Sequence, residues 1–152
     1  MRGTVLEVTS PVMRKILAAV DGSVASLNAA RKALELARLS NASVTLLNVV
    51  SPPLVYGEAG FGVSSGLDEA QDAAGAELLR EVTAALDPVL PVPTTLKLQG
   101  IPADAISEAA TQGEYDMVVV GNTGRGSVSR LLVGSVADRL VRICKVPLLL
   151  VR

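Results

Sequence analysis

Ile16-Leu17-Ala18-Ala19-Val20, followed at once by Asp21-Gly22-Ser23, is the stretch that decides the fold. A continuous apolar run that stops at a turn is typical of a strand buried on both faces of a sheet. After the turn, apolar residues recur at helical spacing along one face: Val24, Leu27, Ala30, Leu34 and Ala37. The stretch therefore predicts a buried strand followed by an amphipathic helix.

The same alternation of strand and helix continues to the end of the chain. Further strands are predicted at residues 43–50, 94–98, 117–120 and 147–151. Helices are predicted at residues 67–86, 102–113 and 135–144. Residues 51–66 contain two prolines, four glycines and three serines, and we expect them to form a long loop. Five apolar strands separated by helices are typical of an α/β fold with a parallel sheet that is covered on both faces.

One domain, residues 14–152, accounts for this whole pattern. Residues 1–13 lie ahead of it and are a candidate for a disordered N-terminal extension of unknown role. Glu7 interrupts what would be the apolar core of a signal peptide, so we do not expect a secretion signal. No stretch of the sequence is apolar over the length that a membrane-spanning helix needs.

Composition excludes several classes of site. The chain has no histidine, which rules out histidine-based triads and histidine-ligated metal centres. Its single cysteine, Cys144, cannot form an intrachain disulfide or a thiolate zinc site, and a reduced cytoplasmic compartment is the expected location. Fourteen basic against fifteen acidic residues, with two tyrosines and one phenylalanine, do not favour binding to a nucleic-acid polymer.

A glycine-rich segment follows the strand at 117–120 and is the strongest candidate for a binding site. It runs Gly121-Asn122-Thr123-Gly124-Arg125-Gly126-Ser127, and Gly134-Ser135 then opens a helix. Glycine lets backbone amides approach an anion, and a helix N-terminus adds free N–H donors and a positive dipole end. Ser127 and Ser135 can add hydroxyl donors, and Arg125 and Arg130 can add charge. Ligands of open parallel sheets bind at this edge, outside the carboxyl ends of the strands.

Two familiar phosphate motifs are not matched by this segment. No Walker lysine follows the glycines, and Ser129 occupies the third glycine position of the dinucleotide-binding pattern. The alternative is a surface loop that uses glycine only for its turns. A buried strand before the segment and a helix after it favour anion binding over that alternative.

Asp21 stands at the carboxyl end of the first strand, where two roles are open. Its carboxylate can accept a hydrogen bond from a base amino group or a ribose hydroxyl. It can also serve as a turn residue or as the N-cap of the helix that follows. Serine nucleophile chemistry is not expected, because there is no Gly-x-Ser-x-Gly elbow and no histidine to act as base.

These residues together resemble the universal stress protein family. The likeness rests on Arg14-Lys15-Ile16-Leu17-Ala18-Ala19-Val20-Asp21-Gly22-Ser23, Leu46-Leu47-Asn48-Val49-Val50, Gly100-Ile101-Pro102, the spacing Gly121-x2-Gly124-x9-Gly134-Ser135 and the ending Val146-Pro147-Leu148-Leu149-Leu150-Val151. It covers residues 14–152 in order. The resemblance implies a five-stranded parallel sheet of Rossmann-like form, homodimers and, in the subgroup that keeps the glycine motif, binding of ATP or AMP.

The resemblance also implies which residues hold the nucleotide. Asp21 and Val49 would contact adenine, with Ala19 and Val20 beside them. The ribose and phosphates would lie against Val120, Gly121, Gly124, Gly134, Ser135 and Val136. We add Arg125, Gly126 and Ser127 from the loop, and we assign no catalytic residue and no metal ligand. The chain departs from the common pattern at Asn122-Thr123, where Ser-His is frequent, and at Asn48, which is often histidine.

Three functions compete at this stage. The leading one is an adenine-nucleotide-binding stress-response or regulatory protein whose ligand is ATP, AMP or ADP, with or without Mg²⁺. A slow Mg²⁺-assisted hydrolase or phosphotransferase is the second, although the chain lacks a histidine and a P-loop lysine for efficient phosphoryl transfer. A nucleotide-free dimeric interaction module is the third.

A homodimer is expected to form through the final strand, residues 146–151. In a sheet with the order 3-2-1-4-5 this strand lies at an edge, and it carries no charge before Arg152. A second copy pairing antiparallel would bury Leu148 and Leu150, or Leu149 and Val151. The alternative is a monomer in which residues 1–13 fold over the edge.

Overall fold

The computed structural model describes residues 12–52, 65–86, 91–125 and 133–152. Its strands are β1 (Lys15–Ala19), β2 (Ser43–Val50), β3 (Thr94–Gln99), β4 (Met117–Gly121) and β5 (Leu148–Val151). Its helices are α1 (Val24–Ser40), α2 (Ser65–Ala85), α3 (Pro102–Gln112) and α4 (Ser135–Ile143). The strands form one sheet in the order β3-β2-β1-β4-β5, and every neighbouring pair is parallel. The predicted α/β class and strand order are confirmed.

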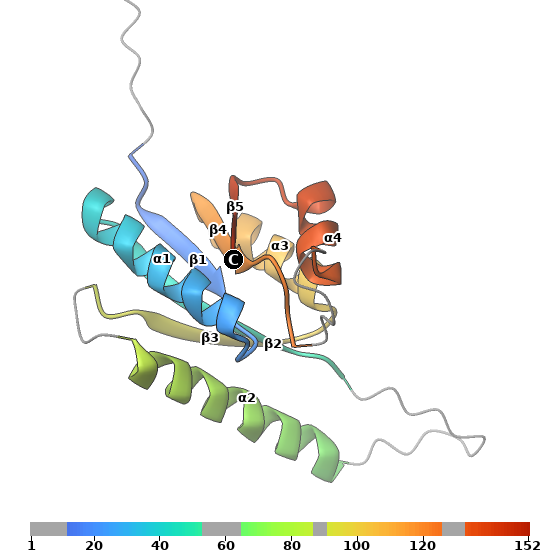
Figure 1. Cartoon of the computed structure of the whole chain (residues 1–152). Helices are drawn as coiled ribbons and strands as arrows, with labels where there is room; N and C mark the ends of the chain where they lie inside the picture. The colour runs from blue at the N-terminus through green and yellow to red at the C-terminus, as the bar shows by residue number, and fades with distance from the viewer. Residues whose placement is uncertain (1–11, 53–64, 87–90, 126–132) are drawn as a thin grey trace, which may run out of the picture.

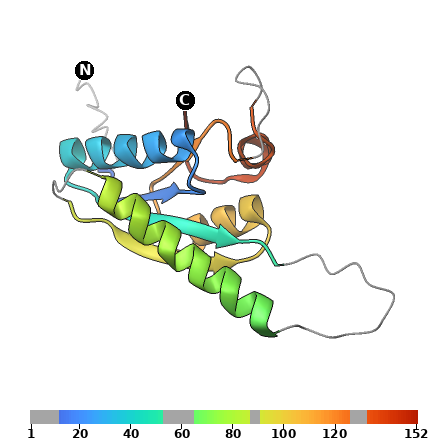
Figure 2. The same cartoon turned by 60° about the horizontal axis from the view of Figure 1, so that its bottom comes forward.

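Two helices cover each face of the sheet (Figures 1 and 2). Successive residues of β1 alternate between the two faces, so that Ile16 and Ala18 pack against α1 and α2 while Leu17 packs against α3 and α4. The alanines of α1 let that helix lie close to the sheet, and all five are buried: Ala25, Ala29, Ala30, Ala33 and Ala37. Burial on both faces explains why the strands read as continuous apolar runs.

The ends of several elements differ from the prediction by one or two residues. Val20 lies past β1, because the ladder between β1 and β2 ends where Ala19 stands opposite Leu47. β5 begins at Leu148, because Pro147 has no N–H to donate; its carbonyl accepts from Val118 N at 2.8 Å. α2 begins at Ser65 and therefore takes in the last residues of the predicted loop. The rest of that loop, residues 53–64, and the extension 1–11 lie outside the described residues.

The start of α1 decides between the two structural roles that the sequence left open for Asp21. Ser23 is the N-cap, and its Oγ accepts from Ser26 N at 3.2 Å. Asp21 lies two residues earlier and its Oδ1 accepts from Ser23 N at 2.9 Å, which is an Asx turn. The N-cap role for Asp21 is therefore wrong, and its role as a turn residue is confirmed.

Helix α2 lies close to the sheet at Gly75. A Cβ added there would lie 2.8 Å from Val50 Cγ2 and 2.9 Å from Asn48 Oδ1. Asn48 is buried and hydrogen-bonded, and Val50 is branched at Cβ, so neither side chain can move aside at low energetic cost.

In the part of the chain that the structure describes, no helix combines the length and apolarity needed to cross a membrane.

We predict that Gly75→Ala lowers the free energy of unfolding by about 1 kcal/mol or more, because the overpacked contact outweighs the gain of about 1 kcal/mol that alanine brings to a helix interior. Urea unfolding measures the change. The neighbouring exposed position supplies the control, since Ala76→Gly reports helix propensity without the sheet contact. A Gly75→Ala protein more stable than wild type would contradict the prediction.

Candidate functional site

A cavity of about 630 Å³ opens at the carboxyl ends of the central strands. This is the edge at which ligands bind in open parallel sheets. One group of lining residues is apolar and comes from strand ends and from the starts of α3 and α4: Ala19, Val20, Leu47, Val49, Pro102, Ile106, Val120, Val133, Val136 and Ala137. The other group is polar or glycine and comes from the loops after β1 and β4 and from α1 and α4: Asp21, Ser26, Gly121, Thr123, Gly124, Arg125, Gly134 and Ser135.

All of the predicted binding residues that the structure describes line this cavity. They come from four separate parts of the chain: Ala19 to Asp21, Val49, Val120 to Arg125, and Gly134 to Val136. Gly126 and Ser127, as well as Arg130, lie outside the described residues. Their contact with a nucleotide stays a prediction, but the topology has brought together residues that are more than a hundred positions apart in sequence.

Sequence reasoning missed several lining residues: Ser26, Leu47, Pro102, Ile106, Thr123, Val133 and Ala137. The parallel register gives a signal for Leu47, which stands opposite Ala19, the last residue of β1. Pro102 and Ile106 enter because α3 starts at the same edge of the sheet, directly after β3. No comparable signal identifies Ser26, which is not part of the apolar stripe predicted for this helix but is buried in α1.

The Asp21 carboxylate joins the loop after β1 to the loop after β4. Its Oδ1 accepts from Ser23 N at 2.9 Å, and its Oδ2 accepts from Arg125 N at 3.2 Å. Gly124 lies so close that an added Cβ would be 2.8 Å from Asp21 Oδ2. The glycine at this position is therefore required by the contact between the two loops.

Backbone donors face the cavity from the start of α4. Gly134 is the N-cap, no side chain caps this helix, and Gly134 N donates to Asn122 O at 2.7 Å. The N–H groups of a helix's first turn have no carbonyl partner within the helix. Because Ser135, Val136 and Ala137 form that turn and line the cavity, the site offers an anion both hydrogen-bond donors and a positive dipole end.

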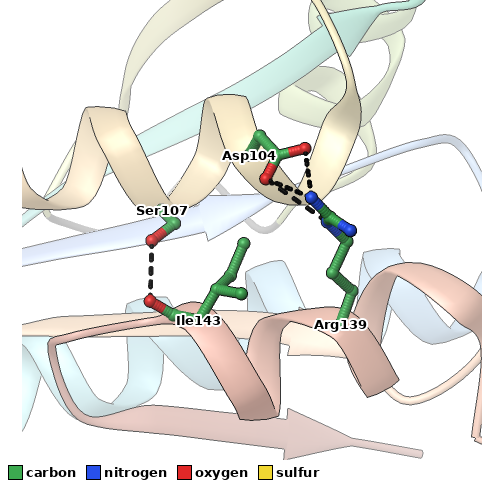
Figure 3. A network of polar contacts seen from close by, with 4 residues as sticks. All are labelled: Asp104, Ser107, Arg139 and Ile143. Carbon is green, nitrogen blue, oxygen red and sulfur yellow. Dashed lines mark hydrogen bonds and ion pairs between the residues drawn. The ribbon is translucent and has the colours of Figure 1, made fainter.

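Helices α3 and α4, which both supply cavity walls, are joined by polar contacts (Figure 3). The guanidinium of Arg139 donates to both oxygens of Asp104, with Nη2 at 2.8 and 2.9 Å. Ser107 Oγ donates to Ile143 O at 3.3 Å. The ion pair is half exposed, so it contributes little to overall stability, but its forked geometry fixes the two helices relative to each other.

The environment of Asp21 favours its charged form. Burial raises the pKa of the carboxyl group, but hydrogen bonds from Ser23, Ser26 and Arg125 outweigh burial and hold the pKa below its ordinary value of 3.8. Such a carboxylate is a good acceptor and a weak base. Among the described residues, no group of three or more carboxylate or thiol side chains gathers as a metal centre would require.

We predict that Asp21→Asn lowers the free energy of unfolding at neutral pH. The folded-state pKa lies below the ordinary value of 3.8, so the stabilisation by the carboxylate is complete above that value and is lost as the pH falls through the folded pKa. The difference in the free energy of unfolding between wild type and variant should therefore become smaller in strong acid. Urea unfolding across a pH series measures it, and a difference that stays constant down to about pH 3 would contradict the assignment.

Comparison with known proteins agrees with this architecture. The sequence model of the Universal stress protein family matches residues 13–152. A universal stress protein of Thermus aquaticus is 35% identical over 144 residues, which cover 93% of this chain and 100% of that protein. The structure of UspA from Lactobacillus plantarum superposes with a TM-score of 0.80 at 30% identity, covering 92% of this chain and 98% of the other. A universal stress protein solved in complex with cAMP superposes with a TM-score of 0.68 at 26% identity, covering 93% and 98%. The family match spans both the sheet and the cavity at its carboxyl edge, and this chain belongs to the universal stress protein family.

Proposed function

We propose that this chain binds an adenine nucleotide, ATP or AMP, in the cavity and acts as a nucleotide-dependent stress-response or regulatory protein. The observation that carries the proposal is the pairing of an apolar wall with the first turn of α4 in one cavity. A nucleobase needs an apolar wall to lie against, and a phosphate needs the free N–H groups of a helix's first turn. The relative solved with cAMP supports an adenine nucleotide as the ligand class.

Each part of the nucleotide has a matching set of residues in this proposal. Adenine lies against Ala19, Val20 and Val49, with Asp21 accepting from the nucleoside. The ribose and phosphates follow the backbone of Val120, Gly121, Gly124 and Arg125 to the start of α4. Gly134, Ser135 and Val136 then hold the phosphates through their N–H groups.

We do not assign Asp21 as a general base for hydrolysis. A general base works best with a pKa near the working pH, whereas the hydrogen bonds on this carboxylate lower its pKa. We therefore propose that the protein binds the nucleotide and that the state of the bound nucleotide is the signal.

We predict that Gly124→Val weakens the binding of ATP and of AMP by at least about tenfold. This is the loss of affinity expected when backbone donors can no longer reach a charged group. Isothermal titration calorimetry measures the affinities, and mass spectrometry of small molecules released from purified wild-type protein identifies any nucleotide carried from the host. Ala76→Val, at an exposed position of α2, is the control for an added side chain remote from the cavity. Unchanged affinity in Gly124→Val would remove this loop from the site.

We also propose that the protein is a homodimer paired through β5. This strand is last in the sheet order and pairs with β4 on one side only. Its side chains alternate between the faces, with Leu148 and Leu150 toward α3 and α4 and Leu149 and Val151 toward α1 and α2. All four stay partly exposed, which leaves apolar surface and edge backbone groups for a second copy.

Light scattering on wild type, Leu149→Lys and Leu150→Lys tests the dimer. We expect a dimeric wild type and dissociation by at least one of the two substitutions, because a buried lysine at the seam has no partner. Leu39→Lys is the matched control, since Leu39 is 82% exposed at the end of α1. A monomeric wild type would overturn the proposal, and dimers that survive both substitutions would place the interface elsewhere.

A further inference from the structure

Two polar side chains are buried among the described residues, Ser26 on α1 and Asn48 on β2. Ser26 is 3% exposed and Asn48 is 7% exposed. Burying a polar group is unfavourable unless it is hydrogen-bonded, so such residues call for an explanation. Both side chains hydrogen-bond to the same peptide group, the one between Val20 and Asp21.

Asn48 holds the carbonyl side of this peptide. Its Nδ2 donates to Val20 O at 2.8 Å. The β1–β2 ladder has ended one residue earlier, and Val20 N makes the last backbone contact by donating to Leu47 O at 2.8 Å. Val20 is buried, so its carbonyl needs a partner that the sheet no longer provides. The Asn48 amide is that partner.

Ser26 holds the N–H side of the same peptide. Its Oγ accepts from Asp21 N at 3.3 Å and donates to Ser23 O at 2.9 Å. Because a peptide group is planar and stiff, hydrogen bonds to its oxygen and to its N–H fix the orientation of the whole plane. That plane sets the direction in which the chain leaves β1 toward the cavity.

Asp21 is the residue whose position depends on this plane. Its carboxylate lines the cavity and receives the amides of Ser23 and Arg125. A rotation of the preceding peptide would move the carboxylate away from one amide or from both. The loops after β1 and β4 would then lose the contact that joins them.

We propose that Ser26 and Asn48 are positioning residues that clamp the Val20–Asp21 peptide and so aim Asp21 at the nucleotide and at Arg125. The inference rests on the proposed function, because it takes Asp21 to face the bound nucleoside. Although Ser26 lines the cavity, the proposal gives neither Ser26 nor Asn48 a contact with the ligand. Their effect on binding passes through Asp21.

A double-mutant cycle on AMP affinity tests the clamp. Asn48→Leu removes the hydrogen bond to Val20 O, and Ser26→Ala removes the hydrogen bonds from Asp21 N and to Ser23 O. Each substitution should weaken AMP binding by about tenfold. In an Asp21→Ala background the same substitutions should change the affinity by less than about twofold, because the residue that they position is gone. Calorimetry is performed below the unfolding temperature of each variant, as established by circular dichroism.

Two matched variants control for the loss of a similar hydrogen bond elsewhere. Asn28→Ala removes an amide that donates to Arg152 O at 3.1 Å, and Thr83→Val removes a hydroxyl that donates to Leu79 O at 2.7 Å. Both should bind AMP as wild type does. If Ser26→Ala and Asn48→Leu lower stability but leave the affinity at the wild-type value, the clamp is purely structural and the proposal is overturned. An affinity loss that persists in the Asp21→Ala background would also overturn it, since it would mean direct contact with the ligand.

Amide hydrogen exchange on the ligand-free protein separates this proposal from the proposed function. Asn48→Leu touches neither Ser23 N nor Arg125 N, yet it should speed the exchange of both amides by at least about threefold, because both donate to Asp21. If wild type binds no adenine nucleotide, the proposed function fails and this measurement still decides the clamp. Exchange at Ser23 and Arg125 that matches wild type would overturn it.

Discussion

The constraint on which the rest of the structure depends is the complete burial of β1 between β2 and β4. Ile16, Leu17 and Ala18 have no exposed surface. Polar contacts hold the backbone at the two ends of the strand. At the amino end, Asp116 accepts from the backbone amides of Arg14 and Lys15 at 2.7 and 2.9 Å. At the carboxyl end, Asn48 donates to the carbonyl of Val20.

Periodicity in the sequence was enough to predict the class of fold and to place Asp21 and the glycine-rich segment at the carboxyl edge of the sheet, whereas the other predicted binding residues came from the family resemblance. Apolar runs identify strands because a strand buried on both faces accommodates few polar residues. Glycines next to a strand end indicate a backbone that lies close to another group or to a ligand. The roles of Ser26 and Asn48 could not be predicted in this way. Asn48 lies inside an apolar strand and Ser26 lies outside the predicted apolar stripe of its helix, and only the three-dimensional structure shows that both reach one peptide. The need for glycine at position 75 could not be predicted from the sequence either, because its neighbours Asn48 and Val50 belong to another element.

Gly124 shows how a motif can carry two requirements at once. The sequence indicates glycine here so that backbone can approach a phosphate, and the structure adds a second reason in the nearby Asp21 carboxylate. The two reasons are compatible, because the contact with Asp21 uses the amide of Arg125 and leaves the first-turn amides of α4 without a partner within their helix. A loop anchored at its first residues loses less conformational entropy when the ligand binds.

The polar groups of the cavity differ in what they can offer a nucleotide. Asp21 already accepts hydrogen bonds from two backbone amides. A nucleoside hydroxyl or amino group can use the remaining lone pairs of its oxygens, but a further hydrogen bond to these oxygens stabilises the complex less than a first one. The first-turn amides of α4 have no partner within their helix, and an anion placed there gains their hydrogen bonds outright. Most of the affinity should therefore come from the phosphates at α4, while Asp21 determines which way round the nucleotide lies. This division of labour gives the clamp its importance: a residue that orients the nucleotide has to be held accurately, and Ser26 and Asn48 hold the peptide that carries it.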